Sequence, residues 1–557
     1  MGGPSTTKVR YRDRLVEVRP GETLLAALSR RGLPILERSA RYRRPRGPFC
    51  GIGQCTGCLV RVNDRPLVRA CRHSPADGDV VANESGWPSV WFDLFGAVDL
   101  LTPGGLDPFR GFRRPGFLVP LYQRVVRRLS GYGRYSVEAI PSAPGPGPIY
   151  RSTDIAIIGA GTSGRAAAER LVSLGARPLL LDRAPGTAAP DGAERIGNAS
   201  VTMLTPPPPD GAREFSLLGF VENGGGFSVR ARTVVVATGG YDGPLLFAGN
   251  DRPGVVTADL VLGLTPDQER SWFRRAALVG GGPRAREVLD RLGPKVAAVI
   301  APGEVRPEVV RAASDLDIPI YPRSLILAAR GRKRIRRLEL AARGQGPHFS
   351  LACDGVVLAH RRLPNSSLLF QGGAEMEWRA GTGAYYPTVE PAGRTSVPGL
   401  YAIGEVAGVG RADARASGER VADAIAPRSA TAAAPAEPLP RVPREGPSEL
   451  EGYYRELLGE RRSGRWVACR CEDVLLDDVE RAHRAGYRGI EVLKRHTSLG
   501  AGLCQGRYCL PDALLLLAIR EERPPSEVGY IRQRPPVYPT PLAALASLDP
   551  TGPAERP

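Results

Sequence analysis

Residues 154–183 read DIAIIGAGTSGRAAAERLVSLGARPLLLDR, and this stretch says most about the architecture of the chain. An apolar strand leads into a glycine-rich turn, an alanine-rich helix follows, and a second apolar strand ends at Asp182. Gly159, Gly161 and Gly164 have the spacing that allows a tight turn, a close approach of pyrophosphate and close helix–strand packing. The acid after the second strand suits a ribose. We therefore predict an adenine-dinucleotide site here, filled by FAD or by an adenine nucleotide only.

Two later segments look like the rest of the same domain. The run TVVVATGG places Thr238 and Gly239 after a strand, and TSVPGLYAIGEVAG places Gly404 and Glu405 after another. An acid at the end of such a strand can bind the ribityl or pyrophosphate part of a flavin. The helix expected from about 415 to 426 adds N–H donors for phosphate. The sequence thus predicts a split FAD-binding domain.

A second, weaker glycine-rich turn follows at 276–300, AALVGGGPRAREVLDRLGPKVAAVI. Gly280, Gly282 and Ala285 fit the relaxed spacing, which predicts an inserted Rossmann-like unit of the NAD-binding type. Its second strand ends at Ala301 without an acid for NAD or an arginine for NADP. Binding of NAD(P) and a retained fold without the ligand both stay open.

Cysteine spacing is the most informative chemical signal near the N-terminus. The first four cysteines follow a C-x4-C-x2-C pattern with one further cysteine downstream, which is typical of a plant-type 2Fe–2S loop. Glycines between them allow the backbone to curl around sulfur. Zinc and plain structural thiols are the alternatives. The expected ligands are Cys50, Cys55, Cys58 and Cys71.

Another four cysteines lie near the C-terminus, as CRCED and CQGRYC, on either side of a run broken by Gly486 and Gly489. A small helical unit of this size has little core, so a metal centre would stabilise it. Spacing alone also allows zinc. The ninth cysteine, Cys353, lies in an apolar run and is interpreted as a core residue. The expected metal ligands are Cys469, Cys471, Cys504 and Cys509.

Composition excludes several functions. The chain has 557 residues and a net charge of +18, almost all from arginine, but the arginines are spread and form no basic stripe. We therefore expect no nucleic-acid partner. No run of 18 apolar residues predicts a transmembrane segment, and no secretory signal is evident. We expect a cytoplasmic protein, with peripheral attachment to the inner face of the membrane left open.

Five stretches, spread over nearly the whole chain, carry a resemblance to a known family, and they occur in the same order as in that family. The chain resembles the alpha subunits of the heteromeric sarcosine oxidase, opine oxidase, proline dehydrogenase and hydrogen cyanide synthase group. Its C-terminal cysteine unit resembles the bacterioferritin-associated-ferredoxin-like 2Fe–2S domain. The matching stretches are ARYRRPRGPFCGIGQCTGCLVRVN (40–63), WPSVWFDL (87–94), ATGGYDGPLLFAGNDRPGVV (237–256), KRHTSLGAGLCQGRYC (494–509) and RQRPPVYPTPLAALA (532–546).

The resemblance implies an α/β flavoprotein with two dinucleotide-binding domains, a β-grasp ferredoxin-like domain before them and a small helical 2Fe–2S domain after them. The boundaries we expect are 1–85 for the ferredoxin-like domain, 86–150 for an irregular connector, 151–265 and 346–430 for the split FAD domain, 266–345 for the NAD-like insert, 431–448 for a linker, 449–525 for the second 2Fe–2S domain and 526–557 for a Pro-rich tail.

The resemblance also implies a division of labour. A separate D-amino-acid-oxidase-like FAD subunit would oxidise the amine, and this chain would pass electrons through flavin and two 2Fe–2S clusters to an acceptor protein or quinone. FMN would sit where the subunits meet, with Lys494, Arg495 and Thr497 as its phosphate contacts. A basic helix end is the alternative interpretation of those residues.

No catalytic residue is predicted, because the five histidines form no recognisable constellation. The leading hypothesis is an electron-transfer subunit of a dehydrogenase or oxidase acting on CH–NH donors such as proline, hydroxyproline, opines or sarcosine-like amines. The runner-up is a self-contained NAD(P)H-dependent iron–sulfur flavoprotein reductase. A non-catalytic scaffold that holds clusters is the third interpretation.

Overall fold

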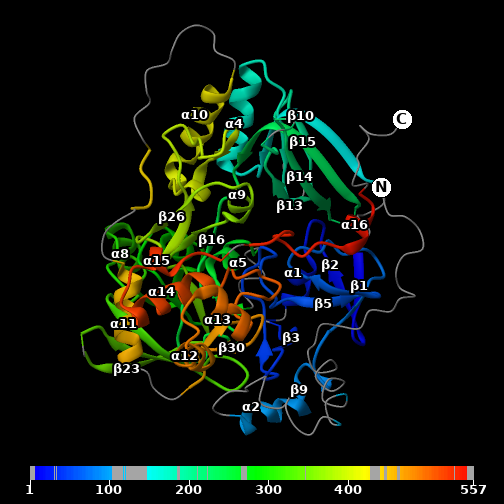
Figure 1. The fold of residues 1–557 in the computed structure, drawn as a ribbon. Helices are drawn as coiled ribbons and strands as arrows, with labels where there is room; N and C mark the ends of the chain where they lie inside the picture. The colour runs from blue at the N-terminus through cyan, green and yellow to red at the C-terminus, as the bar shows by residue number, and fades with distance from the viewer. Residues whose placement is uncertain are drawn as a thin grey trace. The chain divides into compact units, whose positions relative to one another are not determined.

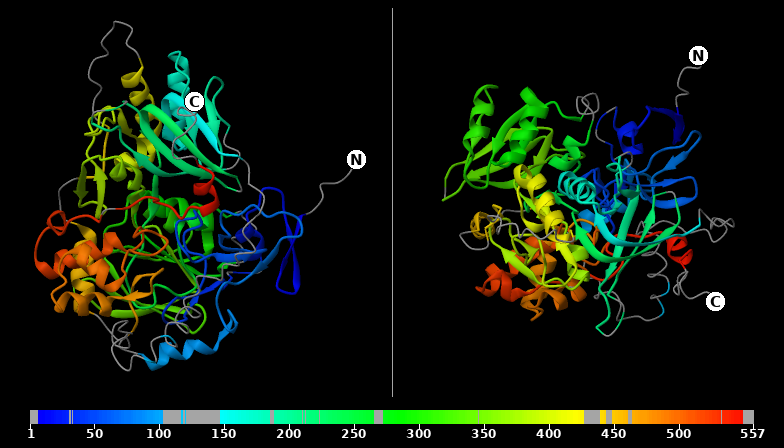
Figure 2. Two further views of the ribbon diagram at one scale, coloured as in Figure 1. Left: turned by 45° about the vertical axis from the view of Figure 1, so that its right-hand side comes forward. Right: turned by 90° about the horizontal axis from the view of Figure 1, so that it is seen from above.

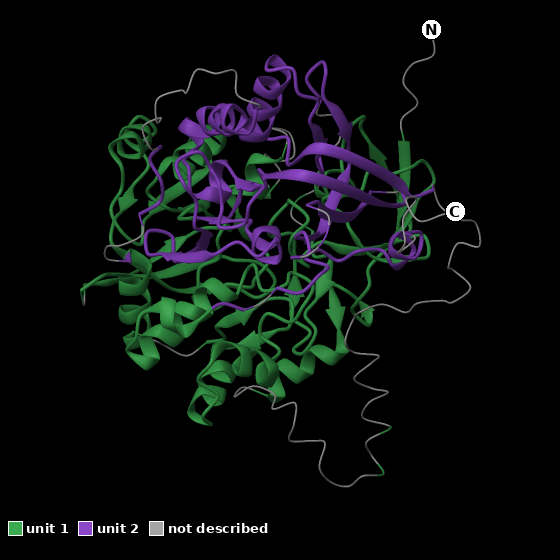
Figure 3. Ribbon diagram, turned by 45° about the horizontal axis from the view of Figure 1, so that its top comes forward, with its two compact units in different colours: residues 1–140, 242–361, 449–529 green, residues 141–241, 362–448, 530–557 purple. Residues whose placement is uncertain are grey.

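The computed structural model describes residues 7–30, 32, 34–102, 117, 120, 147–184, 188–209, 211, 213–222, 224–264, 272–344, 346–426, 439–443, 448–460, 464–531 and 533–548. The chain divides into two compact units (Figure 3). Unit 1 contains residues 1–140, 242–361 and 449–529, and unit 2 contains residues 141–241, 362–448 and 530–557. Most of the predicted connector at 86–150 and of the linker at 431–448 lies outside the described residues.

Unit 1 begins with a five-stranded sheet in the order β2-β1-β7-β5-β6. The first two strands form an antiparallel hairpin, and β7 then pairs in parallel with β1, which is the β-grasp arrangement. Thr23 caps the helix of this domain by accepting a hydrogen bond from the Ala26 N–H. The elements are β1 (Thr7–Tyr11), β2 (Arg14–Val18), α1 (Leu24–Ser29), β5 (Leu59–Val62), β6 (Arg65–Arg69) and β7 (Val80–Ala82).

The inserted part of unit 1 is a parallel sheet in the order β17-β24-β18-β19-β20. Its strands are apolar almost throughout, as expected for a sheet buried on both faces. Its elements are β17 (Val255–Thr257), α5 (Ala258–Leu262), β18 (Ala276–Val279), α7 (Pro283–Leu292), η4 (Gly293–Lys295), β19 (Val296–Ile300), α8 (Pro307–Ser314), β20 (Ile320–Tyr321) and β24 (Gly355–Leu358), with the antiparallel strands β21 (Ser324–Arg330), β22 (Arg337–Ala342) and β23 (His348–Ala352) beside it.

The β-grasp sheet and the inserted sheet share one hydrophobic core. Val60 and Val81 of the first sheet belong to the same buried cluster as Val256 and Leu278 of the second. The C-terminal helices join this unit through Tyr453, whose hydroxyl accepts a hydrogen bond from the Ile326 N–H at 3.2 Å. The three stretches of unit 1 are therefore one packed body, although they are far apart in sequence.

The C-terminal part of unit 1 is mostly helical and is drawn in orange in Figure 1. A two-stranded pair precedes most of the helices, and the first two cysteines of the second set lie at its turn. The elements are α11 (Glu449–Gly459), β29 (Val467–Cys469), β30 (Val474–Leu475), α12 (Leu476–Arg484), α13 (Ile490–Thr497), α14 (Leu510–Glu521) and α15 (Pro525–Val528). The glycines expected to break the helical run fall between α12 and α13.

Unit 2 is built on a sheet in which β12, β11, β10 and β15 run parallel and β28 pairs in parallel with β15. Strands β14 and β13 continue it in antiparallel fashion. Figure 2 shows α4 and α10 side by side. The elements are β10 (Ile149–Ile158), α4 (Thr162–Ser173), β11 (Leu179–Leu181), β12 (Glu194–Ile196), β13 (Ala199–Thr205), β14 (Phe215–Val221), β15 (Gly226–Val236), α9 (Ser367–Gln371), β26 (Met376–Arg379), β27 (Ala384–Pro387), β28 (Leu400–Ala402), η5 (Gly404–Ala407), η6 (Arg411–Asp413) and α10 (Ala414–Ile425).

Part of the predicted Pro-rich tail packs into the core of unit 2. Val537 and Tyr538 belong to the same buried cluster as Val201 and Leu217 of the sheet. The Val537 N–H donates to the Thr202 carbonyl at 2.8 Å. The last element of the described tail is α16 (Leu542–Ala546). The tail thus contributes apolar surface to the nucleotide-binding fold.

The predicted fold class is confirmed: a β-grasp domain, a split Rossmann-like domain with a Rossmann-like insert, and a small helical C-terminal domain all occur. The remaining short elements are β3 (Glu37–Arg38), β4 (Pro45–Arg46), β8 (Pro88–Ser89), β9 (Phe92–Asp93), η1 (Leu94–Gly96), α2 (Ala97–Leu101), β16 (Gly240–Asp242) and β25 (Arg362–Pro364). Among the described helices, none has both the length and the apolar character needed to cross a membrane.

Candidate functional site

The first cysteine set lies in the loop between β4 and β5 and in the turn after β6. All four side chains are buried. Gly51 has a φ of +68°, and a Cβ built on it would lie 2.8 Å from the Cα of Leu260. Only glycine therefore fits at this point of the loop. The loop brings together Cys50, Cys55, Cys58 and Cys71, as the spacing predicted.

Hydrogen bonds favour the thiolate form at one member of this set. Burial opposes ionisation of Cys50, but hydrogen bonds from the Cys55 side chain and from the backbone N–H groups of Ile52, Gln54 and Cys55 lower the pKa of Cys50 to about 6. The Cys55 N–H donates to the Cys50 sulfur at 3.3 Å. N–H groups aimed at sulfur also suit thiolates that bind iron, since hydrogen bonds to sulfur tune a cluster.

The second cysteine set is assembled from two places in the C-terminal domain. Cys469 and Cys471 lie at the end of β29 and in the turn that follows, whereas Cys504 and Cys509 lie in the turn that leads into α14. The sulfur of Cys471 is 3.6 Å from that of Cys469 and 3.5 Å from that of Cys504. Hydrogen bonds from Cys471 and Cys509 lower the pKa of Cys469 and of Cys504 well below the usual range.

The chemistry of the donors fits iron–sulfur clusters in both places. Each set offers four sulfurs at buried or half-buried positions, and thiolates are the ligands that hold 2Fe–2S clusters. Cys353, the remaining cysteine, is buried after β23, and burial raises the pKa of its thiol to about 12. Within the described residues, no group of three or more His, Cys, Asp or Glu side chains is arranged to hold a single metal ion.

Cys55 of the first set lines the same pocket as all four cysteines of the second set, although more than half of the chain separates the two sets in sequence. Phe49, which precedes Cys50, packs edge-on against Tyr508, which precedes Cys509, with ring centroids 5.3 Å apart. Residues of both sets contribute to the walls of one small space. The pocket is lined by Arg46, Cys55, Thr56, Gly57, Cys469, Arg470, Cys471, Cys504, Tyr508 and Cys509.

Arg470 lies between the two sets. It separates Cys469 from Cys471 in the chain, and its guanidinium lies over the Phe49 ring at 4.3 Å. It also donates to the Asn250 carbonyl at 2.8 Å. Burial and the charge of Arg46 lower the pKa of Arg470 to about 10, and negative charges on Asp251 and Cys55 act in the opposite direction. The side chain therefore interacts electrostatically with the first set while it belongs in sequence to the second.

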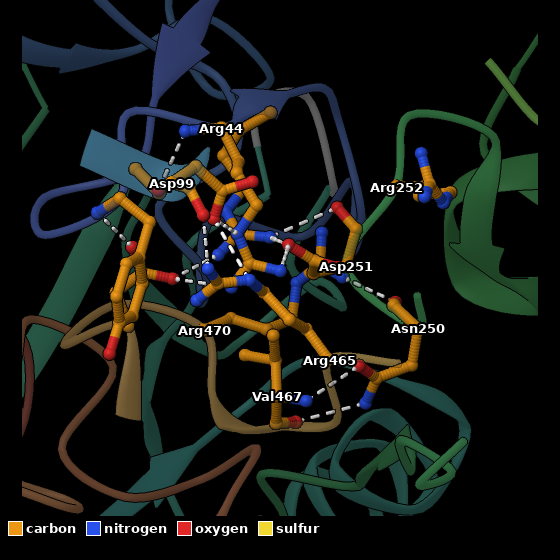
Figure 4. Close-up of polar contacts among 12 residues, drawn as sticks. Arg44, Asp99, Asn250, Asp251, Arg252, Arg465, Val467 and Arg470 are labelled. Carbon is orange, nitrogen blue, oxygen red and sulfur yellow. Dashed lines mark hydrogen bonds and ion pairs between the residues drawn. The ribbon is translucent and has the colours of Figure 1, made fainter. Parts of the chain in front are cut away.

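A buried network of ion pairs connects the segment before the first cysteine set with the inserted domain and with the C-terminal domain (Figure 4). Asp473 accepts from Arg46 at 2.7 Å and pairs with Arg44 at 3.4 Å. Asp251 pairs with the same two arginines, at 3.2 Å for Arg44. Although burial opposes ionisation of Asp251, the charges of Arg44, Arg46 and Arg470 hold its pKa well below the usual range.

The network extends to residues 99 and 465. Asp99 pairs with Arg465 at 3.1 Å and with Arg44 at 3.5 Å. Beside it, Asn250 makes two hydrogen bonds with the backbone of Val467, at 2.9 and 3.1 Å. The connections therefore run from the β-grasp domain, through the inserted domain, to the strand that ends at Cys469.

The glycine-rich turn in unit 2 has the shape needed for a dinucleotide. Gly159 has a φ of +106°, and a Cβ on Gly164 would collide with the Gly159 carbonyl oxygen. At Gly161, by contrast, nothing lies within 4 Å of an added Cβ, which leaves room beside the backbone. The turn opens α4, whose first N–H groups can bind phosphate.

The other predicted nucleotide contacts lie at the same edge of the sheet. Thr238 and Gly239 follow β15, Gly404 follows β28, and Asp182 follows β11. Because these strands are parallel to β10, their carboxyl ends meet at one edge, where such sheets bind ligands. The sequence-predicted residues of the FAD site are therefore brought together.

Two predicted acids of this site have protein partners. Asp182 accepts from the backbone N–H groups of Ala160 and Ala184, at 2.7 and 2.6 Å, and so braces the glycine turn. Glu405 accepts from the Gly240 N–H at 3.1 Å and pairs with Arg362 at 2.8 Å. Their direct contact with ribose or flavin stays a prediction.

The second glycine-rich turn is arranged differently. Gly280 and Gly282 stand between β18 and α7, as the sequence predicted. Arg284, the second residue of α7, pairs with Asp242 at 3.2 Å and with Asp259 at 2.5 Å. The positive charge of Arg284, the arginine nearest the turn, is therefore compensated by carboxylates of the protein itself.

The three predicted FMN contacts do not share one surface. Arg495 is exposed and Lys494 is half-buried on α13, whereas Thr497 is buried. The Thr497 hydroxyl donates to the Leu493 carbonyl at 2.7 Å, and the Thr497 carbonyl accepts from Arg41 at 3.0 Å. The two cations remain candidates for a phosphate, while the threonine serves the helix end.

Sequence reasoning missed Arg470 and the ion-pair network. Two signals were present: a cation placed between two cysteines in CRC, and the dense arginines of ARYRRPRG at 40–47 directly before the cysteine loop. Neither signal says which carboxylates pair with these arginines, because those partners lie hundreds of residues away.

Comparison with known proteins defines the class of the chain. Residues 5–86 match the 2Fe-2S iron-sulfur cluster binding domain, residues 210–433 match the pyridine nucleotide-disulphide oxidoreductase family, and residues 463–548 match the sarcosine oxidase A3 domain. The chain therefore combines a 2Fe–2S type of domain, a segment similar to pyridine nucleotide-disulphide oxidoreductases and a segment similar to the sarcosine oxidase A3 domain.

Individual proteins show similarity over a larger part of the chain. The chain is 28% identical to the alpha subunit of sarcosine oxidase from Rhizobium meliloti over 94% of its own length and 56% of that relative. It is 26% identical to the opine oxidase A chain of Agrobacterium tumefaciens over 71% of its length and 92% of that relative. The chain is thus similar over most of its length to a sarcosine oxidase alpha subunit and an opine oxidase A subunit, which confirms the predicted resemblance.

A solved structure shares the whole architecture. L-proline dehydrogenase from P. horikoshii superposes with a TM-score of 0.65 at 18% identity, over 97% of both chains. At this identity the likeness concerns the fold alone. The chain spans little more than half the length of the sarcosine oxidase component that it matches.

Proposed function

We propose that the chain is the electron-transfer subunit of a heteromeric enzyme that oxidises the CH–NH bond of a secondary amino acid, proline, hydroxyproline, an opine or a sarcosine-like amine. The observation that carries this proposal is the pocket that Cys55 of the first set lines together with all four cysteines of the second set. This pocket brings the two four-cysteine sets close to each other. Facing one another, they suit the passage of electrons from one to the other.

The ligand assignment follows from the thiol positions. Cys50, Cys55, Cys58 and Cys71 would hold one 2Fe–2S cluster, and Cys469, Cys471, Cys504 and Cys509 the other. Such clusters each accept one electron at a time. The chain's own residues hold the thiols in place, exclude water from most of them, and direct N–H groups at sulfur. Phe49 and Tyr508 keep the two loops in contact.

The nucleotide site supplies the connection to flavin chemistry. Gly159, Gly161 and Gly164 would receive the pyrophosphate of FAD, and Gly404 and Thr238 lie at the same strand ends. FMN would sit at the contact with a D-amino-acid-oxidase-like partner, near Lys494 and Arg495. Oxidation of the amine to an imine on that partner releases two electrons and two protons. The electrons then leave one at a time to an acceptor protein or a quinone.

The first experiment counts metal and separates the two sites. Anaerobically purified wild-type chain is analysed for iron, sulfide and zinc, and its dithionite-reduced spectrum is recorded by electron paramagnetic resonance. Two 2Fe–2S centres correspond to about four irons per chain. Cys50→Ser and Cys504→Ser should each remove a different signal and about half of the iron. Cys353→Ser is the matched control, because this buried cysteine lies outside both sets.

The second experiment asks where the electrons come from. The chain is mixed anaerobically with a co-expressed D-amino-acid-oxidase-like partner and an amine, and bleaching of the visible spectrum is followed. We expect bleaching with amine and partner together and none with NADH or NADPH alone. Rapid bleaching by a nicotinamide nucleotide would instead favour the self-contained reductase. Colourless, zinc-rich protein would contradict both.

A further inference from the structure

The charges around the pocket between the cysteine sets do not cancel evenly. Three arginines and three aspartates form the ion-pair network, and each arginine has at least one aspartate within 4 Å. The arginines are Arg44, Arg46 and Arg465, and the aspartates are Asp99, Asp251 and Asp473. The formal charges of these six residues therefore sum to zero, and Arg46 is the one among them that lines the pocket.

Arg470 stands outside that balance. Among the described residues no carboxylate lies within ion-pair distance of it, and its guanidinium contacts the Asn250 carbonyl and the face of Phe49. Asp251 is near enough to interact with it electrostatically, but that carboxylate already pairs with two arginines of the network. Burial raises the pKa of the neighbouring Glu37 to about 8, so this carboxyl is largely neutral at pH 7.

An unneutralised cation in a low-dielectric site is costly unless an anion faces it. Two of the anions that act on Arg470 are Asp251 and Cys55 of the first set, and Arg470 lines one pocket with Cys55 and all four cysteines of the second set. The residue follows Cys469 and precedes Cys471 in the chain, and it lines the same pocket as Cys55 of the other set. We propose that Arg470 is a shared positioning residue whose positive charge raises the reduction potentials of both proposed clusters together. This inference rests on the proposed function, because it requires that both cysteine sets hold a redox centre.

The physical reason is that reduction adds a negative charge to a group that is already anionic. A fixed cation stabilises the reduced form more than the oxidised form, so the potential rises. A unit charge about 8 Å from a redox centre, at an effective dielectric constant near 20, changes such an equilibrium by about tenfold or more. Because Arg470 lines one pocket with Cys55 of the first set and the cysteines of the second set, removing its charge should move both potentials in the same direction.

The test is a redox titration of three variants followed by electron paramagnetic resonance. Arg470→Gln removes the charge, Arg470→Lys keeps it without the planar contact on Phe49, and Arg488→Gln removes an equal charge from the surface of the same domain. The Arg488 side chain is 68% exposed, so solvent screens its charge. Iron content and the circular dichroism spectrum of each variant check that the clusters and fold are retained.

We expect both midpoint potentials of R470Q to fall, each by about 59 mV, which is tenfold for one electron. R470K should keep most of the wild-type values, and R488Q should equal wild type. If R470Q does not accumulate as folded protein, the midpoint potentials of R470K provide the test. If neither potential of R470K is close to its wild-type value although the positive charge is kept, charge is not the cause.

The outcome that overturns the inference is an R470Q protein with two normal signals whose potentials are unchanged, or with only one of them shifted. That result would leave the proposed function standing. Failure of the proposed function has a different signature, because the wild-type chain itself would then lack two reducible centres. The two failures are therefore distinguishable in a single series of samples.

Discussion

Replacing Asp473 by asparagine should loosen the contact between the two cysteine domains more than any surface change. Its carboxylate is fully buried and uses both oxygens. One oxygen accepts from the guanidinium groups of Arg46 and Arg44, and the other accepts from the backbone N–H groups of Tyr42 and Arg41. An asparagine has one acceptor oxygen, so its amide N–H₂ must face donors on one side.

The size of the effect follows from the charges left behind. The network would keep three guanidinium groups and only two carboxylates. Removing one partner of a buried ion pair typically costs about 3–5 kcal/mol, because the other charge stays buried without compensation. That is a large part of the total stability of a domain, which is about 5–15 kcal/mol. We expect Asp473→Asn to expose the segments around it to solvent well below the temperature of global unfolding.

Hydrogen exchange measured by mass spectrometry provides a local assay. In Asp473→Asn, peptides covering 38–47 and 464–476 should exchange faster, whereas a peptide covering β10 in unit 2 should be unchanged. Asp154→Asn is the matched control. Asp154 is 80% exposed and pairs with an exposed Arg232, and such surface pairs contribute little. The reasoning is refuted if Asp473→Asn and the control show the same exchange.

The pH dependence gives an independent check with a definite sign. Burial opposes ionisation of Asp473, yet Arg46 and Arg44 lower its pKa below the usual value. A carboxylate with a depressed pKa stabilises the fold above the pKa of the unfolded chain, and this stabilisation disappears as pH falls through the folded-state pKa. The difference between wild type and Asp473→Asn should therefore shrink below about pH 4.

Three further outcomes are expected. Glu37→Gln should be more stable than wild type at pH 9 but not at pH 5, as measured by urea unfolding. Burial raises the pKa of Glu37 to about 8, so the folded wild type loses stability as the pH rises toward that value. Each unit of difference between the folded and unfolded pKa corresponds to about 1.4 kcal/mol. Gly51→Ala should lower the free energy of unfolding by about 1–3 kcal/mol and reduce the content of bound iron, because a Cβ at φ +68° would collide with Leu260. Gly21→Ala is the control: its φ is +77°, but its Cβ would meet no other atom, so this variant should keep its iron. Gly164→Ala should lower the content of bound adenine nucleotide measured after acid release, because its Cβ collides with the carbonyl at the start of the turn; an unchanged content would mean that the nucleotide binds elsewhere.

Much of the nucleotide-binding fold could be predicted because its signals are local. The strand, glycine turn and helix of residues 154–183 are contiguous in sequence. A Cβ on Gly159 or Gly164 would collide with backbone a few residues away or at the end of the neighbouring strand, so both positions require glycine. The placement of Thr238, Gly404 and Asp182 at one sheet edge then follows from parallel strand order. Side-chain partners such as the arginine on Glu405 could not be predicted, because no periodicity specifies them.

The cysteines show the same division. The amino-acid sequence alone determined which residues supply sulfur and how each set is spaced, since ligand spacing within a loop is a property of the local backbone. Tertiary structure decided that Cys55 lines one pocket with the second set and that, in the described part of the chain, Arg470 lies there with no carboxylate at ion-pair distance. The reason is that charge balance depends on pairs such as Arg46 and Asp473, which are 427 residues apart and meet only when three stretches of chain pack into one core.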